Sequence, residues 1–328
     1  MTLWKDASRA HDLEEMRRGP RLPGSVWPVT MPAPPPVPAR PTLKVGVVGA
    51  GRVGAVLGAA LRSAGHEVVA VSAVSEESRE RADVLLPGVP VLPVPEVVQS
   101  AQLVLLAVPD DALADLVAGL HATDTWVAGQ LVAHTSGRHG LAPFAPVADR
   151  LLPMAIHPAM TFTGTSLDLH RLTECCFGIT TPEVLRPVAE ALVVEMGSEA
   201  VWVPEEARGR YHAALAHGSN HLVTLVAQAM EILRSAGIEP ADHVLRPLLQ
   251  ASLDNALSSG DGALTGPVAR GDAGTVAAHL SELSSLSEDI GPAYRAQARA
   301  TALRASRTGR LRKDAAQTIL TTLDEETR

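Results

Sequence analysis

Three glycines occupy residues 49–54, where the sequence reads GAGRVG. A short apolar run, LKVGVVGA, precedes them, and a helical pattern follows and ends near Gly65. In this setting Gly49 permits a tight turn, Gly51 lets the backbone approach a pyrophosphate, and Gly54 lets the helix pack closely on the strand. The exposed amides and the positive end of that helix attract phosphates. The pattern therefore predicts a dinucleotide-binding turn.

The end of the second strand, EVVAVSAVS, decides which dinucleotide is expected. An NAD site usually places Asp or Glu there, to accept hydrogen bonds from the ribose hydroxyls. This strand carries Ser72 instead, which does not repel a 2'-phosphate, and Arg52 or one of the following arginines, Arg79 and Arg81, could pair with one. The composition of this strand end favours NADP. NAD stays open, because a small error in the strand boundary would place Glu76 or Glu77 at the ribose.

Further strand ends carry polar residues, and ligands of open parallel sheets lie over the carboxyl ends of strands. VPDD and AHTSG follow two such strands, although their residues also suit turns and helix caps. His157 follows a third strand, LPMAIHP, and could orient a carboxylate or donate a proton, or simply be a satisfied turn histidine. The residues expected to contact the cofactor are Gly49, Ala50, Gly51, Arg52, Val53, Gly54, Ser72, Val108, Pro109, Thr135 and Ser136.

Three segments that differ in composition and hydrophobic pattern make up the chain, and they are expected to position these residues. Residues 1–41 are rich in proline, which predicts an extended tail. In residues 42–204 short apolar strands alternate with helices, which predicts an α/β domain with a Rossmann-type parallel sheet. Residues 205–328 are helical throughout and begin with some thirty residues without proline, a helix on the order of 50 Å long. This last segment is predicted to be an all-helical domain.

Composition excludes several classes of protein. The net charge is −8 and only 3% of the residues are aromatic, which argues against a nucleic-acid partner. No apolar run approaches the roughly 20 residues of a membrane span, and the N-terminus lacks the apolar core of a signal peptide. The adjacent Cys175 and Cys176 are expected to be core residues, with no metal site. A cytoplasmic protein without a membrane anchor is therefore expected.

The order of GAGRVG, VPDDAL, AHTSG, HPAMTF, YHAALAHGSNHLVTL and LTGPVARGD resembles a bacterial family of Rossmann-like proteins with a C-terminal domain of unknown function. That family is similar to pyrroline-5-carboxylate reductase, ketopantoate reductase and the β-hydroxyacid and 6-phosphogluconate dehydrogenases. The resemblance covers residues 43–305. It implies a nicotinamide-dependent oxidoreductase, a helical domain that forms a homodimer, and an active site between the two domains.

The long helix departs from the better-known relatives at a position that matters for the chemistry. In those relatives a lysine four residues before an asparagine exchanges a proton with the substrate oxygen. Here the asparagine is Asn220 and the earlier position is Ala216. If the protein reduces a carbonyl, another group must supply the proton. The candidate catalytic residues are Asn220, Ser219, His157 and His212, and LTGPVARGD offers Thr265, Gly266 and Arg270 as substrate contacts.

These features together predict an NADP-dependent oxidoreductase that reduces a small carboxylate-bearing 2-oxo acid, with ketopantoate as a candidate. Two alternatives stay open. A cyclic imine of the pyrroline-5-carboxylate type arrives already protonated and does not require the missing lysine. A binding protein that senses NADP without turnover is also compatible with Ala216.

Overall fold

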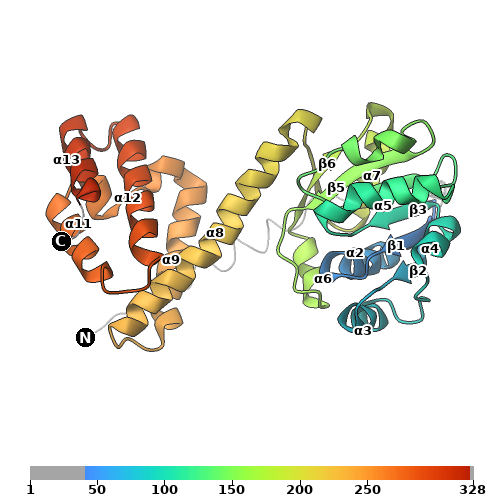
Figure 1. Cartoon of the computed structure of the whole chain (residues 1–328), viewed down its shortest axis with the longest axis horizontal. Helices are drawn as coiled ribbons and strands as arrows, with labels where there is room; N and C mark the ends of the chain where they lie inside the picture. The colour runs from blue at the N-terminus through green and yellow to red at the C-terminus, as the bar shows by residue number, and fades with distance from the viewer. Residues whose placement is uncertain (1–40, 326–328) are drawn as a thin grey trace, which may run out of the picture. The chain divides into compact units, whose positions relative to one another are not determined.

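The computed structural model describes residues 41–325. The proline-rich tail predicted for residues 1–41 lies outside this range except for Pro41. The described chain begins with a region of alternating strands and helices and continues with helices alone, as the sequence predicts (Figure 1). The proposed domain boundary at residue 204 coincides with a change of texture, because the last strand ends at Trp202, but the division itself stays a prediction.

Within residues 41–325, seven strands form one sheet with the order β2-β1-β3-β4-β5-β6-β7. The strands are short and mostly buried, as expected for apolar runs covered on both faces. The chain changes direction of winding between β1 and β3, the place where open α/β sheets bind ligands. Their bounds are β1 (Lys44–Val48), β2 (Glu67–Ser72), β3 (Leu103–Leu106), β4 (Leu131–His134), β5 (Leu152–Pro158), β6 (Cys176–Thr180) and β7 (Glu199–Trp202).

The sheet differs from the expected parallel sheet at one pair of strands. β6 runs antiparallel to β5, while β7 is parallel to β6. The connection from β5 to β6 carries only the six-residue helix α6 (Leu167–Leu172), and an antiparallel neighbour does not require a crossover helix. The sheet is therefore mostly parallel, as predicted, with one antiparallel pair that the sequence analysis did not foresee.

Helices cover both faces of the sheet, and each face has its own core. One core includes side chains of α2 (Arg52–Ser63), α3 (Glu76–Leu85) and α7 (Arg186–Glu195). The other includes side chains of α4 (Val94–Ser100) and α5 (Asp110–Ala122). Figure 1 shows this sandwich of helices, sheet and helices. The doubly wound arrangement is confirmed.

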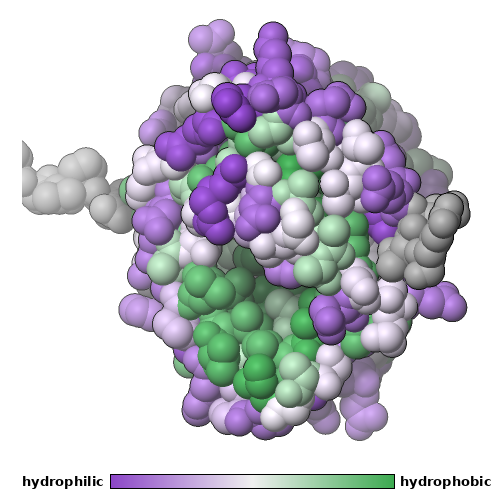
Figure 2. Space-filling model, turned by 90° about the vertical axis from the view of Figure 1, so that its left-hand side faces the viewer, coloured by the Kyte–Doolittle hydropathy of each residue, from purple (hydrophilic) through white to green (hydrophobic). Residues whose placement is uncertain are grey.

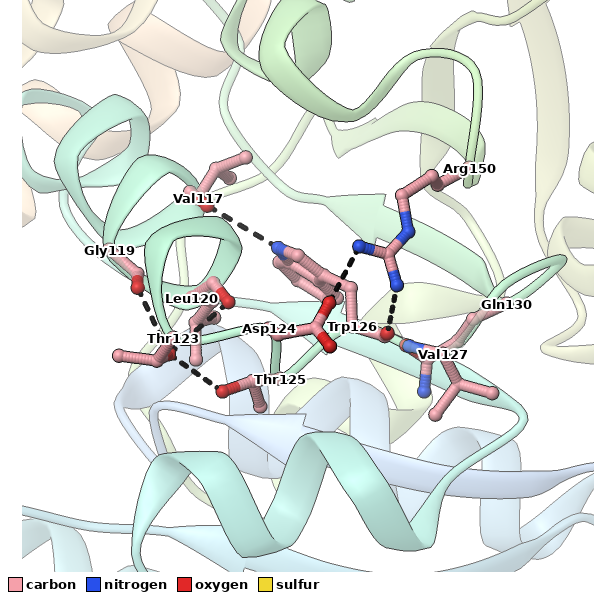
Figure 3. A network of polar contacts seen from close by, with 10 residues as sticks. All are labelled: Val117, Gly119, Leu120, Thr123, Asp124, Thr125, Trp126, Val127, Gln130 and Arg150. Carbon is pink, nitrogen blue, oxygen red and sulfur yellow. Dashed lines mark hydrogen bonds and ion pairs between the residues drawn. The ribbon is translucent and has the colours of Figure 1, made fainter.

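A polar network fixes the turn from α5 into β4 (Figure 3). Asp124 has a positive φ of 48°, and its carboxylate accepts a hydrogen bond from Arg150 Nη1 at 2.8 Å. Arg150 Nη2 donates to the carbonyl of Trp126 at 3.2 Å. The Gln130 amide donates to two backbone carbonyls at the end of α4, both at 2.7 Å. These contacts fix the start of β4, so the opposite end of the strand, at His134, has a defined position.

The C-terminal part consists of α8 (Arg208–Ser235), α9 (Ala241–Ser259), α10 (Gly266–Arg270), α11 (Ala273–Leu283), α12 (Ile290–Arg307) and α13 (Lys313–Asp324). Helices α10 to α13 share a third apolar core. In contrast, α8 buries only Arg208 and α9 buries only Ala241. With 28 residues α8 is about 42 Å long, somewhat shorter than predicted. None of the helices between residues 41 and 325 combines the length and the apolar character needed to cross a membrane.

Candidate functional site

The glycine loop between β1 and α2 has the geometry that the sequence predicts. Gly49 has φ +97°, and a Cβ there would lie 2.6 Å from the carbonyl oxygen of Ala107. A Cβ on Gly54 would lie 2.0 Å from the carbonyl oxygen of Gly49. Neither position therefore admits a side chain. A Cβ on Gly51 would meet no atom within 4 Å, so the space over the N-terminus of α2 is open for a ligand.

Ser72 holds this loop from the end of β2. Its hydroxyl oxygen accepts a hydrogen bond from the Gly49 amide at 3.0 Å, and its carbonyl accepts one from the Ala50 amide at 2.8 Å. The side chain is buried. Ser72 thus has a structural role in shaping the turn, and its predicted contact with a cofactor stays a prediction.

Two arginines lie beside the loop. Arg81 of α3 donates a hydrogen bond through Nη1 to the carbonyl of Ala50 at 3.2 Å. A Cβ built on Gly164 would lie 2.6 Å from Arg81 Nε and 3.0 Å from Arg52 Cγ, so both side chains pack against this glycine. The loop therefore carries two positive charges beside its phosphate-binding amides, a suitable setting for an additional phosphate.

The segment that contains Gly164 is held by a buried carboxylate that the sequence analysis missed. Asp168 is fully buried, and its Oδ2 accepts hydrogen bonds from the amides of Thr163 and Gly164 at 2.8 and 2.7 Å. Its Oδ1 accepts one from the Thr163 hydroxyl at 3.0 Å. Burial raises the pKa of Asp168, but the hydrogen bonds from Gly164 and Thr163 outweigh it and hold the pKa below its usual value. The carboxylate stays ionised and organises residues 163–168.

The other predicted cofactor contacts lie at neighbouring strand ends. Val108 follows β3 and lies next to the glycine loop, since a Cβ on Gly49 would be 3.5 Å from Val108 Cγ1. Pro109 is exposed and precedes the first residue of α5. After β4, the amide of Thr135 bonds to the end of β3, and the Ser136 hydroxyl accepts a hydrogen bond from an amide of its own turn. Ser136 is buried, so the turn alone accounts for its polarity.

A cavity of about 330 Å³ brings together the four predicted catalytic residues. His157 and residues 159–161 line it from the end of β5 and the following loop. The rest of the lining comes from α8 at spacings of three and four residues, which place side chains on one face of a helix. These residues are His212, Leu215, Ala216, Ser219 and Asn220. Ala216, where relatives carry the lysine, therefore lines the same cavity.

His157 is hydrogen-bonded and uncharged at neutral pH. Its Nδ1 lies 2.9 Å from the hydroxyl oxygen of Tyr211. Burial lowers the pKa of His157 to about 4, and the neighbouring Arg208 and His212 act in the same direction. A neutral imidazole can donate a hydrogen bond, but it is not an imidazolium acid at pH 7. This weakens the prediction that His157 supplies the proton.

Arg208 is the first residue of α8 and only 2% of its surface is exposed. The sequence analysis did not identify it as a candidate site residue. Its guanidinium donates to the Thr180 hydroxyl at 2.7 Å and to the carbonyls of Ala155 and Gly178 at 3.0 Å each. A fourth, longer bond of 3.4 Å reaches the carbonyl of Ser136. Burial lowers the pKa of Arg208. One side chain thus joins the start of α8 to β5, β6 and the turn after β4.

The segment LTGPVARGD does not contribute to this cavity. Thr265 is the N-cap of α10, Gly266 has φ +87°, and Arg270 is exposed in the last turn of that helix. None of the three lines the cavity. The buried side chains of α10 pack instead into the core of α10 to α13. The predicted contact of Thr265, Gly266 and Arg270 with substrate therefore has no support within one chain.

Two family models match parts of this chain. The family described as Rossmann-like domain matches residues 33–158. The family described as domain of unknown function DUF2520 matches residues 175–301. Among curated protein sequences none matches this chain.

Solved structures of the same fold come from several bacteria. A proposed NADP oxidoreductase from Bacteroides fragilis has a TM-score of 0.67 and 23% identity, covering 79% of this chain and 98% of its own. A Thermotoga maritima protein has a TM-score of 0.58 and 20% identity, covering 81% and 99%. An imine reductase from Myxococcus stipitatus in complex with NADP⁺ has a TM-score of 0.58 and 17% identity, covering 86% and 100%. At these identities the likeness shows a shared fold. The chain thus shares the fold of these proteins and is similar to the Rossmann-like family in its first part and to the DUF2520 family in its second part.

Proposed function

We propose that the protein is an NADP-dependent oxidoreductase that reduces a small C=N substrate, such as a cyclic imine. The observation that carries this proposal is the loop of residues 159–166. At Gly164 the loop contacts Arg52 and Arg81, and at residues 159–161 it lines the cavity. Thr161 and Gly164 are three residues apart, at most about 11 Å along the chain. A nucleotide held at the glycine loop is thus within reach of a substrate in the cavity.

The residues present suit a dinucleotide with an additional phosphate. The open space at Gly51 and the first amides of α2 would hold the pyrophosphate. Arg52 and Arg81 would pair with the 2'-phosphate of NADP, and NAD, which lacks this group, would bind more weakly. When bound, the reduced nicotinamide supplies a hydride. The similarity in fold to an NADP⁺-bound imine reductase and an NADP-bound pyrroline carboxylate reductase supports the same cofactor.

The lining of the cavity favours an imine over a 2-oxo acid. Between residues 41 and 325 no lysine, arginine, aspartate or glutamate lines it, and His157 is neutral. Reduction of a ketone requires a proton donor for the oxygen, and a substrate carboxylate requires a cation or several donors. A protonated imine already carries its proton. Thr161, Ser219 and Asn220 are uncharged hydrogen-bonding groups that suit the polar substituents of such a substrate.

Ketopantoate remains the alternative expected from the sequence, and it makes different demands on the site. Arg270, the predicted partner of its carboxylate, does not line the cavity, and Ala216 offers no proton. The proposal therefore ranks imine reduction first. A sensor of NADP without turnover is the remaining alternative.

We also propose that the protein is a homodimer that pairs through α8 and α9. These helices contain 28 and 19 residues, yet each buries only one residue. An apolar groove of about 610 Å³ lies between them, lined from α8 by Leu222, Leu225, Val226 and Met230 and from α9 by Leu245, Leu249, Leu253 and Ala256. Hydrophobic residues also gather around a hollow on the side of the molecule shown in Figure 2. A second copy that presents the same helices would cover this groove.

The cofactor proposal is tested by titrating purified protein with NADPH and NADH and recording nicotinamide fluorescence. Arg52→Ala and Arg81→Ala are expected to weaken NADPH binding by about tenfold each, which corresponds to about 1.4 kcal/mol, with little change for NADH. Arg79→Ala, on the exposed side of α3, is the matched control and should leave both affinities unchanged. Equal affinity for both nucleotides in the unaltered protein would contradict the 2'-phosphate site.

The substrate proposal is tested by following NADPH oxidation with 1-pyrroline, a cyclic imine without a carboxylate, and with ketopantoate. Oxidation with the imine alone is the expected result. Oxidation with ketopantoate alone would support the 2-oxo acid instead. Tight NADPH binding with neither reaction would favour the sensor.

A further inference from the structure

The hydroxyl of Tyr211 occupies a defined position between two strands. Its oxygen lies 2.9 Å from His157 Nδ1, and the two rings meet edge to face with centroids 5.6 Å apart. Gly178 of β6 also lies against this oxygen. A Cβ on Gly178 would lie only 2.5 Å from it, so any other residue at 178 would displace the hydroxyl.

These contacts determine which nitrogen of His157 carries the proton. Among the described residues His157 is the one side-chain hydrogen-bond partner of the Tyr211 hydroxyl, so this O–H is satisfied by donating to His157 Nδ1. Burial raises the pKa of Tyr211, so the hydroxyl keeps its proton. An Nδ1 that accepts a hydrogen bond in a neutral imidazole leaves the proton on Nε2.

Arg208 packs beside the pair formed by Tyr211 and His157. Its Cζ lies 5.8 Å from the centre of the Tyr211 ring. It bonds to the carbonyl of Gly178, the residue that pairs with His157 across the two strands. The charged or titratable groups that act on His157 are Arg208 and His212 of α8, which disfavour a second proton on the ring, and Asp110 of α5, which opposes them.

The Nε2 edge of the ring lies beside Gly137 and His212. A Cβ on Gly137 would lie 2.8 Å from His157 Nε2 and 2.9 Å from His212 Cδ2. Glycine at position 137 therefore leaves space for both histidine side chains. Both rings line the cavity. We propose that Tyr211, braced by Arg208, is a positioning residue that fixes the orientation and tautomer of His157, so that Nε2–H donates a hydrogen bond to a polar group of the substrate.

The tautomer can be measured without any enzymatic activity. We suggest long-range ¹H–¹⁵N NMR of the full chain labelled with ¹⁵N-histidine, with His157 identified by the signal lost in His157→Gln. The expected result is a proton on Nε2 only, unchanged from pH 8 to pH 5. In Tyr211→Phe the ring should populate both tautomers.

Tyr294→Phe is a matched control, because Tyr294 makes the same contact with another histidine, 2.9 Å from His279 Nδ1. It should alter His279 and leave His157 unchanged. A proton on Nδ1 of His157 in the unaltered protein, or an unchanged tautomer in Tyr211→Phe, would overturn the inference.

The role toward substrate rests on the proposed function and has a separate readout. Tyr211→Phe is expected to lower kcat/KM about three- to tenfold, the effect of one hydrogen bond, while the Kd of NADPH stays the same. Absence of turnover in the unaltered protein would remove the proposed function, yet the NMR result would still decide the tautomer. Normal kcat/KM in Tyr211→Phe would overturn the role toward substrate.

Discussion

Alanine substitution is expected to affect NADPH binding at one glycine of the loop and the stability of the fold at another. Gly51→Ala places Cβ in open space, and Gly51 has an ordinary φ of −68°, so we expect the fold to keep its stability. The methyl group would occupy the position of the pyrophosphate, and NADPH binding should weaken about tenfold or more. Gly54→Ala places Cβ 2.0 Å from the Gly49 carbonyl and should destabilise the fold by about 3 kcal/mol. Thermal unfolding and NADPH titration of both variants separate the two effects, and a destabilised Gly51→Ala would contradict the open site.

His134 makes the stability of the fold depend on pH. The side chain is fully buried, with Nε2 donating to the Gly140 carbonyl at 2.7 Å and Nδ1 accepting from the Ser136 amide at 3.2 Å. Burial lowers its pKa to about 4 from an unfolded value of 6.5. Between these values the unfolded chain binds the additional proton, so the free energy of unfolding should fall as pH drops from 6.5 to 4, by about 3 kcal/mol in total.

Urea unfolding at pH 7.5, 6.5 and 5 tests this expectation. His134→Gln should be less stable at pH 7.5, and the gap to the unaltered protein should narrow at pH 5 because one titrating group is gone. His157 shifts in the same direction, so some pH dependence should remain. His121→Gln, on the exposed surface of α5, should change nothing. A gap of constant size at all three pH values would show that His134 does not titrate on unfolding.

At the residue scale the sequence predicts positions that the backbone requires, and it misses buried polar partners. The spacing of Gly49, Gly51 and Gly54 is local, and the loop confirms it. The partners of Arg208 lie 28 to 72 residues away in the sequence, so nothing in its local pattern distinguishes it from a surface arginine. Asp168 was missed for a different reason, since its contacts are local but lie in an irregular loop without periodicity.

At the element scale, long periodic segments were predicted and short irregular ones were not. The apolar strands up to β6 and the long helix α8 are present. β7 was missed because its four residues are mostly exposed and its apolar run, AVW, is short. The direction of β6 could not be read from its sequence, since a buried strand has the same composition in either direction. The cavity-lining face of α8 follows from helical spacing, and it places Ser219 and Asn220 beside His212.

The loop of residues 159–166 should depend on Asp168. Asp168→Ala leaves the amides of Thr163 and Gly164 without their acceptor, and each buried unpaired amide costs about 1–3 kcal/mol. We therefore expect a lower melting temperature and weaker NADPH binding, because Gly164 would no longer hold Arg52 and Arg81 in place. Asp115→Ala, the same change at an exposed site of α5, is the control. Loss of stability without any change in NADPH affinity would contradict the link between this loop and the nucleotide site.

At the scale of the whole molecule, the glycine loop and the cavity are built by different sets of helices and strands. The loop is built by β1, β2 and the helices α2 and α3, whereas the cavity needs both the end of β5 and the face of α8. The sequence spacing predicts the residues of the glycine loop and the residues on the cavity-lining face of α8 separately. It could not place His157 against Tyr211, since the two lie 54 residues apart and meet only through the register of β5 and β6 and the bonds of Arg208.

The same helix α8 is expected to hold two copies of the chain together. Leu253 of α9 lines the apolar groove and is 44% exposed in a single chain, so burial of this surface by a second copy would stabilise the pair. A charge at this position would have to be desolvated in the dimer. We expect sedimentation equilibrium to give twice the 34.3 kDa of one chain for the unaltered protein and a single chain for Leu253→Asp. Val84→Asp, at a site of α3 that is 74% exposed, should remain a dimer. A monomeric unaltered protein would contradict the proposal, as would a Leu253→Asp variant that still pairs. Retained NADPH binding in monomeric Leu253→Asp would show that the glycine loop needs no partner.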